Sequence, residues 1–128
     1  MANSPPRQEK QVAFPRRGEV YLVHFDPTVG LEIQKTRPAL VLQNGVSNQY
    51  SQITIVAAIN LQFAEPPFPC QVVIEPADSG LPRRSAVIVN QIRSIDRQRL
   101  GKRIGHLFQQ DMERVDDAAK ISLGLIEF

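Results

Sequence analysis

Apolar residues alternate with polar ones in short runs along this chain, and turn residues separate the runs. In RRGEVYLVHF, residues 16–25, Val20 and Leu22 fall on one side of an extended strand and Tyr21, Val23 and Phe25 on the other. This spacing predicts a strand buried on both faces. The segments ALVLQN, QITIVAAINL, CQVVIEP, SAVIVNQIRSI and RIGHLF predict five more short strands.

One segment has helical spacing instead. Its apolar side recurs at Met112, Val115, Ala119 and Ser122 or Leu123. This pattern predicts a single helix that begins at Gln109 and ends at Gly124. RQRLGK predicts one helical turn, and NGVSN predicts a turn after the second strand. Six short strands and one terminal helix predict a mainly β (α+β) fold, a small and mostly antiparallel barrel.

The domain organisation is simple. Residues 1–15 contain paired prolines and scattered charges without periodicity, so we expect a flexible leader there and one domain over residues 16–128. DPTVGLEIQKT, residues 26–36, carries turn residues and predicts an exposed loop of a length that is often functional.

Composition excludes several classes of protein. Apolar residues make up 42% of the 128 residues and charged residues 22%, as in ordinary globular domains. Cys70 is the only cysteine, which rules out an intrachain disulfide and favours a reducing compartment. No apolar run reaches the ~18 residues of a membrane helix, so we expect a cytoplasmic protein without membrane contact. His24 and His106 lie far apart and lack metal-ligand spacing, so no metal site and no cofactor are expected.

The basic residues permit a basic face on the protein, although solvated surface arginines explain most of them taken singly. Fifteen Lys and Arg outnumber thirteen Asp and Glu, and the acidic residues gather in the last third of the chain. The sequence offers no glycine-rich phosphate loop, G-x-S-x-G elbow or Cys/His pair, so a protein nucleophile is unsupported. RNA supplies its own nucleophile, the 2′-hydroxyl.

Arg37 stands at the front of a buried strand in KTRPALVLQN, where Pro38 keeps it extended. A planar guanidinium there can contact two phosphoryl oxygens and stabilise charge that builds up during attack. The alternative is a solvated arginine whose stem covers the strand edge.

Four blocks of the chain resemble the MazF/PemK family of toxin endoribonucleases, in the family's order. They are RRGEVYLVHFDPTVGLEIQKTRPALVLQN, NQYSQITIVAAI, SGLPRRSAVIVNQIRSIDRQRLGKRIGHL and DMERVDDAAKISLGL. The resemblance implies an SH3-like antiparallel barrel with a C-terminal helix, a homodimer, and a MazE-like antitoxin that covers the RNA-binding groove. It also implies metal-independent, sequence-specific cleavage of single-stranded RNA that leaves a 2′,3′-cyclic phosphate.

The same resemblance implies roles for individual residues. Arg37 in TRP corresponds to the catalytic arginine, and Asn60 occupies the position of a threonine that assists it. Roles in RNA binding are implied for Glu32, Lys35, Asn44, Gln91 and Arg93. Arg93 has an alternative role as the ion-pair partner of Asp96, which we slightly favour. Ser47 and Asn48 in the NGVSN turn are further candidates for base contacts.

Two departures from the family pattern matter. Asn60 can donate a hydrogen bond to phosphate but cannot transfer a proton near neutral pH. The sequence therefore leaves open a second hypothesis, a catalytically weakened toxin-like module that binds antitoxin or RNA. Phe108 replaces the usual serine at the start of the last helix and is expected to weaken that start by about 1 kcal/mol.

Overall fold

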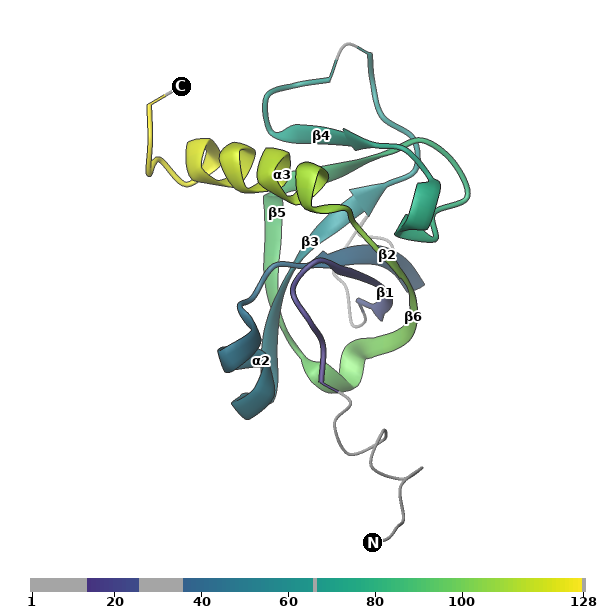
Figure 1. Ribbon diagram of the computed structural model, residues 1–128, viewed down its shortest axis with the longest axis vertical. Coiled ribbons are helices and arrows are strands. Elements are labelled where there is room, and N and C mark those ends of the chain that lie inside the picture. The colour runs from purple at the N-terminus through teal and green to yellow at the C-terminus, as the bar shows by residue number, and fades with distance from the viewer. Residues whose placement is uncertain (1–13, 26–35, 66, 128) are drawn as a thin grey trace, which may run out of the picture.

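The computed structural model describes residues 14–25, 36–65 and 67–127. They form a six-stranded antiparallel sheet in the order β4-β5-β3-β2-β1-β6, with a C-terminal helix against β4 and β5 (Figure 1). The mainly β fold is thus confirmed. The elements are β1 (Glu19–His24), β2 (Thr36–Val41), α2 (Gly45–Tyr50), β3 (Ile53–Asn60), β4 (Gln71–Ile74), η1 (Ala77–Ser79), β5 (Ser85–Asp96), η2 (Arg97–Arg99), β6 (Leu100–His106) and α3 (Gln109–Ser122).

Alternate residues of the central strands enter two separate cores, one on each side of the strongly bent sheet. The first core lies under α3 and contains Val20, Leu40, Ile59 and Val115. The second core contains Val23, Phe25, Ala39, Val41, Val56 and Ile95. Val20 and Val23 of β1 belong to different cores, which confirms that this strand is buried on both faces.

The expected barrel is not closed. β4 and β6 are the two outer strands of the sheet and do not pair with each other. The backbone of η1 lies between them and contacts β6 directly, because glycines stand at both points of contact. A Cβ at Gly105 would lie 2.3 Å from the Asp78 carbonyl oxygen, and one at Gly80, where φ is +77°, would lie 1.8 Å from that of Ile104. The η1 backbone thus fills the gap that a further strand pairing would close.

The NGVSN turn is in fact the short helix α2. Asn44 caps it, because its Oδ1 accepts a hydrogen bond of 2.8 Å from the Ser47 N–H. Asn48 is fully buried and its Oδ1 accepts hydrogen bonds from Thr54 Oγ1 at 2.6 Å and from Gln43 Nε2 at 2.9 Å. This buried polar network fixes α2 against β3.

The C-terminal helix follows the prediction closely. It spans Gln109–Ser122, and Gly124 after it has a positive φ of 74°. Val115 and Ala118 are its buried residues, whereas Leu123, expected on the buried side, is exposed. The helical turn predicted over RQRLGK is only partly confirmed. The η2 turn covers residues 97–99, and β6 begins at Leu100. Within the described residues, no helix is long and apolar enough to cross a membrane.

Candidate functional site

Arg37 lies near the start of β2, at the rim of the second core. It pairs in register with Val23 of β1 and is half-buried, while Pro38 beside it is buried. Because side chains alternate along a strand, Arg37 shares a sheet face with Ala39 and Val41, which belong to the second core. The guanidinium is therefore carried by a strand that is fixed on both faces, which limits its freedom before any ligand binds.

Asn60 ends β3 next to this arginine. The antiparallel pairing of β2 with β3 ends at Ala39 and Ala58, and Arg37 and Asn60 each lie two residues beyond this pair, at the same end of the two strands. Asn60 Oδ1 accepts a hydrogen bond of 3.0 Å from the Gln62 N–H. The NH₂ group of the Asn60 carboxamide has no hydrogen-bond acceptor within the described residues. Asn60 thus presents a donor at the end of β3, the strand next to the one that carries Arg37.

Three arginines converge on the end of β1. Arg37 pairs with β1 in register, the Arg93 guanidinium lies 4.9 Å from the centre of the Phe25 ring, and Arg99 Nη1 donates to the His24 carbonyl oxygen at 3.2 Å. None of the three forms an ion pair with a carboxylate of the described residues. Their positive charge is thus available to an anionic ligand.

The ion pair expected between Arg93 and Asp96 is absent from the described structure. Asp96 Oδ1 instead accepts a hydrogen bond of 2.8 Å from the Gln98 N–H at the start of η2, and Arg93 stacks on the aromatic ring described above. Gln91 is exposed where residues 89–91 of β5 bulge out of the ladder with β3. Such bulges re-aim side chains next to binding sites.

The remaining predicted residues do not join this group. Asn44 lies beyond the far end of β2 from Arg37 and serves as the α2 cap. The prediction that Asn48 contacts a base is wrong, because Asn48 is fully buried. Ser47 is half-buried in the same helix. Glu32 and Lys35, with most of the loop expected at residues 26–36, lie outside the described residues.

A cluster around Glu19 holds β1 against its neighbours. Tyr21 Oη donates to Glu19 Oε1 at 3.1 Å, Arg103 Nε donates to Glu19 Oε2 at 2.8 Å, and the Arg16 N–H donates to Oε1 at 2.8 Å. Burial, followed by the Glu19 charge and hydrogen bond, raises the pKa of Tyr21 to about 12. The cluster links β1 to β6 and so helps to fix β1, which contributes Val23 to the second core.

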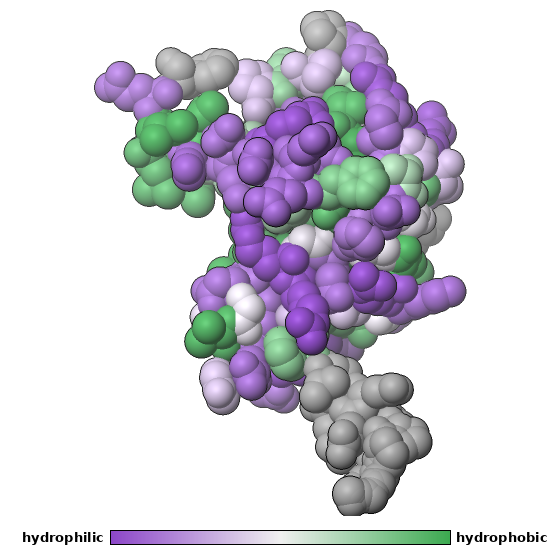
Figure 2. All heavy atoms as spheres, viewed as in Figure 1, coloured by the Kyte–Doolittle hydropathy of each residue, from purple (hydrophilic) through white to green (hydrophobic). Residues whose placement is uncertain are grey.

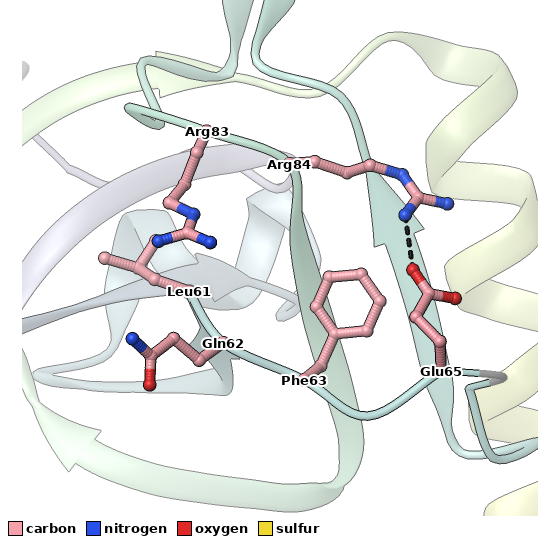
Figure 3. Close-up of a pocket in the computed structure, with 6 residues that line it drawn as sticks. All are labelled: Leu61, Gln62, Phe63, Glu65, Arg83 and Arg84. Atoms are coloured by element: carbon pink, nitrogen blue, oxygen red, sulfur yellow. Dashed lines mark hydrogen bonds and ion pairs between the residues drawn. The ribbon is translucent and has the colours of Figure 1, made fainter.

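An open pocket of about 430 Å³ follows directly after Asn60 (Figure 3). Its lining residues are Leu61, Gln62, Phe63, Glu65, Arg83 and Arg84. Sequence reasoning missed this pocket, since it comes from two irregular segments on either side of β4. The one signal in the sequence was an aromatic residue in the proline-rich stretch FAEPPFP, residues 63–69.

Comparison with known proteins identifies the family. The chain is 43% identical over 113 residues to Endoribonuclease EndoA of Bacillus subtilis (strain 168), which covers 88% of this chain and 97% of that protein. The fold matches Mycobacterium tuberculosis toxin MazF-mt6, with a TM-score of 0.70, 20% identity and coverage of 85% of this chain and 99% of that one. It also matches an endoribonuclease in complex with its cognate antitoxin from Mycobacterial species, with a TM-score of 0.72, 21% identity and coverage of 89% and 99%. Residues 16–123 match the family described as PemK-like, MazF-like toxin of type II toxin-antitoxin system, and the chain belongs to that family.

Proposed function

We propose that this protein is an endoribonuclease toxin that cleaves single-stranded RNA at short sequence motifs. Membership of the toxin family supports the proposal, as does a relative that is itself named an endoribonuclease. The observation that carries it is a basic end of the sheet: Arg37 lies at the same end of neighbouring strands as Asn60, and Arg93 and Arg99 also have no carboxylate partner among the described residues.

The reaction uses the RNA's own nucleophile. The 2′-hydroxyl loses its proton to water as its oxygen attacks the adjacent phosphorus. The bond from phosphorus to the 5′-oxygen breaks, this oxygen takes up a proton from water, and a 2′,3′-cyclic phosphate and a 5′-hydroxyl result. Arg37 donates two hydrogen bonds to the phosphoryl oxygens, where negative charge grows in the transition state. The Asn60 NH₂ group donates to the same phosphate and holds it in line. Because neither contribution requires a metal ion, we propose a metal-independent reaction.

The RNA strand extends from this centre over the basic end of β1. Arg93 and Gln91 on β5 contact the strand on one side of the cleaved phosphate. Glu32, Lys35 and Asn44 stay proposals that rest on the family resemblance, and Asn44 fits only a strand long enough to reach α2. RNA as substrate is also our reason to propose action in the cytoplasm.

A homodimer and a MazE-like antitoxin are the proposed protein partners. Large apolar side chains are exposed in two groups, around α2 and after α3, which supports a further protein interface. Green, hydrophobic spheres gather at the C-terminal end of α3, at the upper left of Figure 2. The exposed residues of the two groups are Val46, Tyr50, Ile53, Leu123, Leu125 and Ile126.

The test is cleavage of a long, weakly structured RNA in the presence of a chelator, with ends mapped by primer extension. We expect Arg37→Ala to lower the rate by about 10²- to 10³-fold, the effect of removing one preorganised donor to developing charge. Arg114→Ala, which removes an exposed α3 arginine, is the matched control and is expected to cleave normally. Cleavage by Arg37→Ala at the native rate would refute the mechanism.

A weakened module that only binds RNA or antitoxin is the alternative, and one observation favours it. Asn60 supplies an amide where proton transfer would need a hydroxyl or another titrating group. Under this alternative, the native protein binds RNA without cleaving it.

A further inference from the structure

The pocket after β3 is tied directly to the proposed catalytic centre. Its first lining residues, Leu61 and Gln62, follow Asn60 in the chain, and the Gln62 N–H donates to Asn60 Oδ1 at 3.0 Å. Arg83 and Arg84 reach the pocket from the segment before β5, where Ala86 pairs with Asn60. A strand of RNA that leaves the Arg37–Asn60 centre in this direction meets the pocket next.

The pocket combines an aromatic ring with one uncommitted positive charge. Arg84 Cζ lies 5.5 Å from the centre of the Phe63 ring, and the guanidinium pairs with both Glu65 and Glu75. These contacts neutralise Arg84 and hold it over one face of the ring. Arg83, on the opposite side of the pocket in Figure 3, has no carboxylate partner within the described residues.

We propose that this pocket binds one nucleotide of the RNA adjacent to the cleaved phosphate, an inference that rests on the proposed function. The base stacks on the Phe63 face that Arg84 leaves uncovered, and the ring lies sandwiched between guanidinium and base. The Gln62 carboxamide, which has both donor and acceptor atoms, hydrogen-bonds the edge of the base. Arg83 binds the phosphate of the same nucleotide.

The composition of the pocket favours a nucleotide over an acidic peptide. Glu65 and Glu75 neutralise Arg84, so Arg83 is the one lining cation without a described carboxylate partner, which suits a single phosphate better than a run of carboxylates. A single base needs one aromatic face and one polar edge contact, and its phosphate needs one cation. The pocket provides this set, and its volume of about 430 Å³ is within the usual range for small ligands.

The test measures binding of a short mixed-sequence RNA with 2′-O-methyl riboses, which cannot be cleaved. We expect Phe63→Ala to raise the Kd about 5- to 150-fold, the equivalent of 1–3 kcal/mol of base–aromatic stacking, without changing the salt dependence. Arg83→Ala should lower the slope of log K against log[salt] by about 0.7, since one phosphate contact is lost. Phe68→Ala and Arg114→Ala, an exposed phenylalanine and an exposed arginine outside the pocket, are the matched controls.

A conservative variant and cleavage mapping complete the test. Phe63→Tyr keeps the stacking face and should bind like the native protein, which separates stacking from a folding defect. Gln62→Ala should relax the preference for one base beside the cleavage site. The backbone N–H of residue 62 still donates to Asn60 Oδ1 in this variant.

The inference and the proposed function fail in different ways. If Arg37→Ala abolishes cleavage while Phe63→Ala and Arg83→Ala keep native affinity, salt slope and cleavage sites, the pocket inference is wrong and the nuclease stands. If native protein fails to cleave but the two pocket variants lose RNA affinity as stated, the pocket inference stands alone. Loss of antitoxin binding with unchanged RNA binding would make the pocket a protein site and overturn the inference.

Discussion

Arg37 shows how a charged side chain is held ready on a buried strand. Its backbone pairs with Val23, its neighbour Pro38 is buried, and Arg37 itself is half-buried at the rim of the second core. A guanidinium fixed in this way loses little conformational entropy when it meets a phosphate. In the proposed reaction, Asn60 at the end of the neighbouring strand supplies the second donor.

Replacement of Asn60 tests what the second donor does. We expect Asn60→Thr to maintain or raise the cleavage rate, because a hydroxyl both donates to phosphate and relays a proton. If proton relay limits the native protein, the gain reaches about 10²- to 10⁴-fold. Single-turnover cleavage of the mapped RNA measures it. Asn60→Ala, which lacks both groups, is the control, and a threonine variant slower than the alanine variant would contradict the expected role.

The proposed roles of Arg37 and Asn60 come from the family resemblance and stay predictions, and the strand order puts both residues at the same end of neighbouring strands. The sequence was not sufficient for Arg93. Its nearest acid in the sequence, Asp96, favoured an ion pair, whereas its actual neighbour is Phe25 on a distant strand. Local spacing contains no information about partners that only the folded sheet brings together.

Among the elements, the strands were the easiest to predict and α2 the hardest. Alternation of apolar and polar residues marks a strand within its own four to twelve residues, whereas a six-residue helix is too short to show periodicity. α2 forms because Asn44 caps its start and the buried Asn48 bonds to Thr54 of β3. The contact with Thr54 is a tertiary contact that NGVSN alone does not reveal.

The start of α3 gives a prediction on stability. Phe108 occupies the cap position with extended backbone angles and makes no side-chain hydrogen bond to the helix. We expect Phe108→Ser to be about 1 kcal/mol more stable than Phe108→Ala, because the hydroxyl satisfies a free N–H of the first turn. Comparing the two variants cancels the loss of the ring and its edge contact with His106. Urea unfolding measures the difference, and equal midpoints would rule out the capping gain.

At the scale of the whole molecule, the sheet remains open and η1 occupies the gap. This could not be predicted from strand patterns, because it depends on direct backbone contact between residues 78–80 and 104–105, far apart in the sequence. Turn glycines are common, so nothing in the sequence distinguished Gly80 and Gly105 as contact points.

Gly105→Ala tests this contact. A Cβ there would lie 2.3 Å from backbone atoms of Asp78 and Ser79, so η1 must move away from β6. We expect the free energy of unfolding to fall by about 1–3 kcal/mol, as for other overpacked sites. Gly45→Ala is the matched control, since nothing lies within 4 Å of its added Cβ, and it should be neutral or slightly stabilising. Equal stability of the two variants would show that η1 yields without cost.

The order of the strands has a consequence for folding during synthesis of the chain. β1 is the first strand to be synthesised, yet one of its two neighbours is β6, the last. The second core, on whose rim Arg37 lies, therefore lacks Ile95 and the adjoining Leu100 until β5 and β6 have been synthesised. The surroundings of Arg37 can form only after most of the sheet has been made.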